Sequence, residues 1–202
     1  MFSLQDLLGQ EQGSEAVGQL TKNLGADQTT VNSAIQMALP MILSGLARNA
    51  ANPQGAESLN NALEQDHNGG LLNNLTDFLG GGMPPPQETN RQTNGIGILG
   101  HIFGNNQTQV AHQVSEKTGM DIGQVAQLMI TLAPIVMNFL GKKKQEENLD
   151  SGGLSNWLGG QQQEIEQSPQ GGLLSGILDK DKDGSVMDDL GSLAMNYMTN
   201  RR

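Results

Sequence analysis

The residues of this sequence best suited to binding a ligand are acidic side chains near its C-terminal end. Three aspartates at alternate positions are followed by a glycine, as in the first half of a calcium-binding loop, where carboxylates converge on one ion. The carbonyl of Ser185 would occupy the seventh position of such a loop. The pattern therefore predicts a calcium site with the ligands Asp179, Asp181, Asp183, Ser185, Asp188 and Asp189.

This acidic loop departs from the EF-hand at its twelfth position, where Leu190 replaces the bidentate glutamate. Asp188 or Asp189 would have to complete the coordination shell, so we expect weak binding, with a Kd of about 10⁻⁴ M or above. Oxygen ligands without nearby cysteine or histidine favour calcium over zinc. An alternative stays open, in which Ser185 and Asp188 form a capping box at the start of a helix and bind no metal.

Other residues with catalytic potential do not form a recognisable motif. His67, His101 and His112 are scattered without the spacing of a zinc site, and we expect them on the surface or in loops. The glycine-rich stretch at 95–100 does not follow a predicted strand, as a dinucleotide-binding loop would. The sequence contains neither GxSxG nor a phosphate-binding loop. We therefore predict that the protein is not an enzyme.

The rest of the chain is organised around an apolar helix that occurs twice, at 27–47 and 121–141. Apolar residues recur at helical spacing in both segments. The shared positions indicate an internal duplication. They are Gly25, Asp27, Val31, Pro40 and Leu46, which match Gly119, Asp121, Val125, Pro134 and Leu140.

The ends of both apolar helices carry local signals. The glycine before each suits the left-handed residue that ends a helix, and Asp27 and Asp121 are favourable N-caps. Gln124 stands where it would complete a capping box with Asp121. Pro40 and Pro134 lack an amide proton, so each should kink its helix or split it in two.

These patterns predict an all-α fold of two related helical units with helix-turn-helix-like packing. The units are residues 1–80 and 95–160. The polar, proline-containing stretch 81–94 is expected to be a disordered linker, and 161–202 a polar linker followed by the acidic, partly helical tail. Whether the two units stay separate or pack on each other within one chain is left open.

Composition restricts the partners and the location. The formal net charge of −10 opposes binding to nucleic acids and anionic membranes. The stretch 128–140 is apolar except for Thr131 and Asn138, and it is shorter than the ~20 residues that a bilayer requires, so no membrane span is predicted. The first 15 residues do not read as a signal peptide, which predicts a cytoplasmic protein, with leaderless export as the open alternative.

A helix-turn-helix outline at 20–35 raises DNA binding as the alternative function. Its second helix would expose uncharged residues, whereas affinity for DNA rests largely on Lys and Arg contacts to phosphate. Lys142 to Lys144 are followed by Glu146 and Glu147, which favours a solvated helix C-terminus over a basic patch. The exposed residues of the first outline are Gln28, Thr29, Asn32, Ser33 and Gln36.

The run QLTKNLGADQTTVNSAIQMALPMILSGLARNAANPQG, followed by LNNALEQDHNGGLLNNL, resembles the YidB-like bacterial family, a domain of unknown function. The second copy and the ending DKDKDGSVMDDLG resemble it as well. The resemblance covers most of residues 1–80, the helix pair at 110–141 and the tail. It implies an all-α fold with a homeodomain-like helix arrangement, and it supplies no activity and no catalytic residues.

These observations together predict a non-enzymatic interaction or assembly protein. Two strongly apolar helices in a chain with 3% aromatic residues carry more apolar surface than we expect one small domain to cover, which predicts homo-oligomers or a protein partner. Weak calcium binding by the tail would accompany this function.

Overall fold

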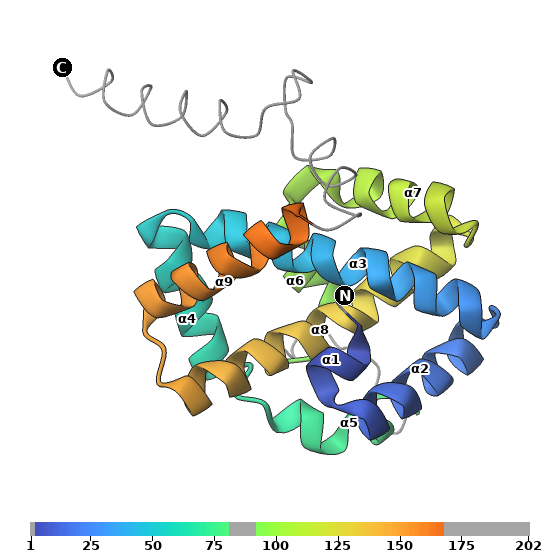
Figure 1. Cartoon of the computed structure of the whole chain (residues 1–202), viewed down its shortest axis with the longest axis horizontal. Helices are drawn as coiled ribbons and strands as arrows, with labels where there is room; N and C mark the ends of the chain where they lie inside the picture. Colours follow the sequence, from blue (N-terminus) through green and yellow to red (C-terminus); the bar gives the residue numbers. More distant parts are fainter. Residues whose placement is uncertain (1–2, 81–91, 168–202) are drawn as a thin grey trace. The chain divides into compact units, whose positions relative to one another are not determined.

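The computed structural model describes residues 3–80 and 92–167, and this part of the chain is all-α, as predicted (Figure 1). No strand lies within these two ranges. The predicted linker falls mainly on 81–91, outside the described residues. The elements are α1 (Leu4–Leu8), α2 (Gln10–Leu24), α3 (Gln28–Ala50), α4 (Pro53–Gln65), η1 (Gly70–Asn74), α5 (Leu75–Leu79), α6 (Gly95–Phe103), η2 (Gly104–Asn106), α7 (Gln107–Thr118), α8 (Ile122–Glu147) and α9 (Ser151–Glu166).

The two predicted apolar helices are α3 and α8, and both begin where their local signals place them (Figure 1). Asp27 and Asp121 each accept hydrogen bonds from two backbone amides of the first turn. Gly25, at φ 63°, and Gly119, at φ 72°, adopt the left-handed conformation that ends the preceding helix. The sequence therefore determines these two helix–turn–helix junctions locally.

Two details of the long helices concern their prolines and the expected capping box. α3 and α8 each continue through their proline, Pro40 or Pro134, so of the two expected effects the split does not occur. Gln124 does not complete a capping box, because its side-chain Nε2 donates to the carbonyl oxygen of Leu24 at 2.8 Å. That bond satisfies a carbonyl at the end of α2 and ties the start of α8 to the first half of the chain.

The long helices pack against each other and against short helices of the opposite half. α3 contacts α6 and α7, while α8 contacts α4 and η1. Residues 1–162 consequently belong to one compact unit. The helical units expected at 1–80 and 95–160 thus pack together within one chain, which is the alternative that the sequence left open.

This packing buries most of the apolar surface that the two helices carry. By length and composition alone, α3 and α8 could each cross a membrane, although no span was predicted. The most apolar stretch of α3 is 72% buried inside the fold, and that of α8 is 56% buried. Core helices share these properties, so two such helices are weak evidence for a membrane location.

A buried polar cluster joins α8 to the loop between α4 and η1. Asn138, 1% exposed, accepts a hydrogen bond from the amide of Leu71 at 3.4 Å, and its Nδ2 lies 3.3 Å from Nδ1 of His67, which is 3% exposed. Gly141 lies so close to the same loop that a Cβ there would be 1.6 Å from the carbonyl oxygen of His67. We call these four residues the His67 junction.

Candidate functional site

The predicted calcium ligands lie outside the residues that the structure describes. This holds for Asp179, Asp181, Asp183, Ser185, Asp188 and Asp189 alike. Within 3–80 and 92–167, no group of three or more histidine or acidic side chains is placed to hold a metal ion. The calcium site therefore stays a prediction from the sequence.

The three histidines occupy different environments. His101 is exposed, and His112 is exposed beside Glu116, with 3.5 Å between Nδ1 and the carboxylate oxygen. His67 lies in a loop, as expected, but its side chain is buried in the His67 junction. Burial lowers the pKa of His67, and the charge of Asp66 partly opposes that shift. His67 is thus a neutral core residue at physiological pH.

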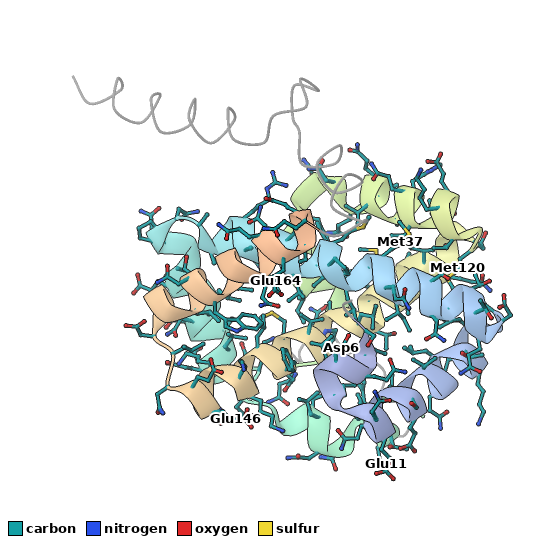
Figure 2. The ribbon with its side chains drawn as sticks, in the orientation of Figure 1. Asp6, Glu11, Met37, Met120, Glu146 and Glu164 are labelled. Carbon is teal, nitrogen blue, oxygen red and sulfur yellow. The ribbon has the colours of Figure 1, made fainter. Side chains whose placement is uncertain are left out.

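The lysine run at the end of α8 is only partly the solvated helix end that the sequence predicts. Lys142 and Lys143 pair with Glu146 and Glu147 one turn later, at 3.9 Å and 2.6 Å. Glu146 lies on the outside of the fold, as do Asp6 and Glu11 (Figure 2). Lys144 differs, because its side chain is only 13% exposed.

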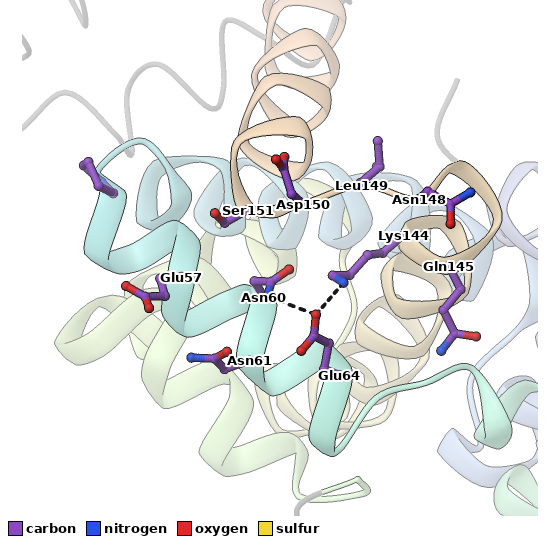
Figure 3. Close-up of a pocket in the computed structure, with 11 residues that line it drawn as sticks. Glu57, Asn60, Asn61, Glu64, Lys144, Gln145, Asn148, Leu149, Asp150 and Ser151 are labelled. Carbon is purple, nitrogen blue, oxygen red and sulfur yellow. Dashed lines mark hydrogen bonds and ion pairs between the residues drawn. The ribbon is translucent and has the colours of Figure 1, made fainter.

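Lys144 lies in an open groove of about 760 Å³ between α4 and the junction of α8 with α9 (Figure 3). The residues that α4 contributes recur at helical spacing and therefore share one face of that helix. We call this feature the α4 groove. It is lined by Pro53, Glu57, Asn60, Asn61, Glu64, Lys144, Gln145, Asn148, Leu149, Asp150 and Ser151.

An ion pair crosses the α4 groove and fixes its two sides. The Nζ of Lys144 donates to Oε1 of Glu64 at 2.7 Å, and the Nδ2 of Asn60 donates to the same oxygen at 3.2 Å (Figure 3). Hydrogen bonds from Lys144 and Asn60 lower the pKa of Glu64, so this carboxylate stays ionised. The only cation of the groove is therefore already engaged by a protein carboxylate.

Three further polar side chains of the groove, Asn60, Asp150 and Glu57, can accept more hydrogen bonds than they do within the described residues. The Oδ1 of Asn60 is buried and accepts no hydrogen bond from the described residues. Asp150 accepts a hydrogen bond from the backbone amide of Gly153 at 2.7 Å, at the start of α9. A carboxylate can accept further hydrogen bonds beside this one. Glu57 is exposed and forms no ion pair within the described part of the chain. The groove therefore offers the exposed carboxylates of Glu57 and Asp150 to an incoming donor, whereas Oδ1 of Asn60 is covered by protein.

The helix-turn-helix outlines do form, at α2–α3 and α7–α8. Gln28, Thr29 and Ser33 are exposed at the start of α3, and Lys22 is exposed near the end of α2. At the start of α8, Ile122, Gly123 and Gln127 are exposed. These surfaces present mainly uncharged groups.

Comparison with known proteins identifies a family. No curated protein and no solved structure matches the chain significantly. The family described as "Bacterial protein of unknown function (DUF937)" matches residues 6–143, which include α2, α3, the whole of α7 and most of α8. The match also includes α4 and thus one side of the α4 groove. Because it covers more than half of the 202 residues, the chain belongs to this bacterial family of unknown function.

Proposed function

We propose that the protein is a non-enzymatic interaction protein that binds a polypeptide partner in the α4 groove. The main support is the groove itself, because its side-chain amides and charged groups can pair with the backbone and side chains of a peptide. The groove is open and has a volume of about 760 Å³, so several residues of a partner chain can lie in it. The Lys144–Glu64 pair supports this function by holding α8 against α4.

The partner could be a second copy of the chain. The apolar helices predicted such self-association from the sequence. The burial of α3 and α8 weakens the original reason. Exposed apolar residues still support it, because Ile96 is 62% exposed and Ile122 is 38% exposed. Such single residues are common on monomers too, so the oligomeric state needs a direct measurement.

The test uses wild-type protein as bait in a bacterial lysate beside an Asn61→Trp variant. Asn61 is exposed within the groove, so the bulky indole should block it without filling the core. We expect a partner that the wild type captures and Asn61→Trp loses. Gln127→Trp, at the opposite end of α8, is the matched control and should retain it. An identical set of proteins on wild type and Asn61→Trp would contradict the proposal, and light scattering would show whether that partner is a second copy.

A DNA-binding regulator is the rival function, favoured by the two helix-turn-helix junctions. Uncharged exposed residues on α3 and a net charge of −10 oppose it. A gel shift on random duplex DNA at low salt would favour this rival over polypeptide binding.

We also propose that the acidic tail binds calcium weakly, through Asp179, Asp181, Asp183, Ser185 and one of the next two aspartates. Calorimetry on the full chain should detect binding with a Kd of about 10⁻⁴ M or above. Asp181→Ala with Asp183→Ala should abolish it, since two alternate carboxylates are lost. A response at millimolar calcium that this double variant leaves unchanged would leave the capping box as the role of Ser185.

The finer family assignment, YidB-like, and the duplication are proposals as well. The matched aspartate caps, left-handed glycines and internal prolines of α3 and α8 support a duplication. A cytoplasmic location remains a prediction from the sequence.

A further inference from the structure

Two asparagines of the chain are directly followed by glycine, at Asn68–Gly69 and at Asn94–Gly95. Asparagine is thermolabile, because the backbone nitrogen of the next residue can attack its side-chain amide. A glycine in that next position carries no Cβ to obstruct the attack. The structure places the two pairs in different surroundings, and these decide which of them can react.

The groups of the Asn68–Gly69 pair lie in a loop, between α4 and η1. Asn68 is exposed, so a leaving group on its side chain can escape to solvent. The N–H of Gly69 donates no hydrogen bond within the described residues, so its nitrogen can react without giving up a partner. Gly69 is buried against Lys142, and base therefore reaches this N–H when the loop opens locally. Loops open at a lower cost than packed helices do.

The Asn94–Gly95 pair is protected, because it forms the start of α6. The N–H of Gly95 donates to the carbonyl oxygen of Thr93 at 2.9 Å, and Asn94 is only half-exposed. A Cβ on Gly95 would lie 1.9 Å from the carbonyl oxygen of Ile130, which is backbone of α8. Ring closure between side chain and backbone would have to move this helix start, and the contact with α8 prevents that.

We propose that Asn68 is a site of spontaneous deamidation, with water as the co-reactant. The nitrogen of Gly69 loses its proton to hydroxide and forms a bond to Cγ of Asn68. The N–H of Gly70 donates to Oδ1 of Asn68 at 3.1 Å, so it stabilises the negative charge that develops on this oxygen. The bond from Cγ to Nδ2 then breaks, and Nδ2 takes a proton from water and leaves as ammonia.

Water next opens the five-membered imide that this step leaves behind. Cleavage of the bond from the Gly69 nitrogen to Cγ gives aspartate with the original backbone. Cleavage of the bond from that nitrogen to the backbone carbonyl carbon gives isoaspartate. In isoaspartate the main chain runs through the side chain of residue 68, so it is longer by one methylene group.

The isoaspartate product should loosen the loop from α8. The carbonyl oxygen of Asn68 accepts a hydrogen bond from Nε2 of Gln145 at 3.2 Å, and in isoaspartate this carbonyl becomes a free carboxylate. The neighbouring His67 has little room to adjust, because a Cβ on Gly141 would lie 1.6 Å from its carbonyl oxygen. The added methylene group should therefore disturb the His67 junction and lower the stability of the fold.

The experiment ages the full chain in mildly alkaline buffer, folded or in guanidinium chloride, and follows both asparagines by mass spectrometry. Tryptic peptides 49–91 and 92–117 separate Asn68 from Asn94, and fragmentation locates the mass gain of OH over NH2. In guanidinium chloride both should react at similar rates, because glycine follows each. In the folded chain Asn68 should react about tenfold faster than Asn94 or more, the effect of a capping interaction on a rate.

Asn68→Gln is the matched variant, because a glutamine side chain would have to close a six-membered ring and reacts far more slowly. Asn68 is exposed, so this replacement should not affect folding. After ageing, the wild type should contain isoaspartate, detected by labelling with an isoaspartyl methyltransferase, and should unfold at a lower urea concentration. Aged Asn68→Gln should show neither change.

Two kinds of result would overturn the proposal. Equal rates at Asn68 and Asn94 in the folded chain, or a folded chain in which Asn68 stays intact while it is consumed in guanidinium chloride, would exclude the site. Aged wild type that carries the modification at Asn68 and still unfolds at the original urea concentration would exclude the effect on the His67 junction.

Discussion

Gly141→Ala should destabilise the fold by about 2 kcal/mol or more, although alanine is the better helix former by ~1 kcal/mol. The added Cβ would lie 1.6 Å from the carbonyl oxygen of His67, which is backbone and cannot turn aside. α8 and the loop between α4 and η1 would have to separate, which would also stretch the hydrogen bond from Leu71 to Asn138. Urea unfolding followed by far-UV circular dichroism measures the loss.

Gly18→Ala is the matched control for this prediction. Gly18 lies inside α2, and a Cβ there would meet no atom within 4 Å. The same substitution should therefore raise the free energy of unfolding by about 0.5–1 kcal/mol, through helix propensity alone. Equal effects of both substitutions would mean that the close approach at Gly141 does not constrain the fold.

The features that the sequence predicted are those that depend on neighbouring residues. Asp27 and Asp121 cap their helices through amides two and three positions away, and Gly25 and Gly119 end helices through their own backbone. Such signals need no knowledge of the tertiary fold. The all-α class and the starts of the long helices were therefore accessible from the sequence.

The α4 groove was not accessible, because its partners are distant in the chain. Lys144 and Glu64 are 80 positions apart, and Lys144 looked like the third member of a solvated lysine run. Only the packing of α4 on α8 sets it apart from Lys142 and Lys143. Helical spacing from Glu57 through Asn60 and Asn61 to Glu64 is the one signal that could have suggested a shared polar face.

The His67 junction was only partly accessible from the sequence. Asn138 interrupts an otherwise apolar stretch of α8, so the sequence marks it as unusual for a core helix. Its partner His67 is 71 positions away and cannot be identified from spacing. A buried amide is retained only where its hydrogen bonds are satisfied, and the partners of Asn138 are Leu71 of η1, His67 of the loop and the carbonyl oxygen of Pro134 in α8 itself.

Asn138→Leu should consequently lower the free energy of unfolding by about 2–4 kcal/mol, even though leucine suits an apolar helix better. The amide of Leu71 and Nδ1 of His67 would both lose their partner in a buried site, at a cost of about 1–3 kcal/mol each. Gln127→Leu, exposed on the same helix, is the control and should change stability by less than about 0.5 kcal/mol. A loss no larger than that of the control would mean that water replaces Asn138 at no cost.

The unfolding experiment belongs at about pH 8, where His67 is neutral in both the folded and the unfolded chain. Burial lowers the pKa of His67 in the folded state, so below its unfolded pKa of about 6.5 the unfolded chain binds more protons. The free energy of unfolding of the wild type should therefore fall as the pH drops below about 6.5. The charge of Asp66 opposes the shift that burial causes, so it should reduce this acid loss without abolishing it. A stability that stays constant down to about pH 5 would show that the His67 junction admits a protonated imidazole.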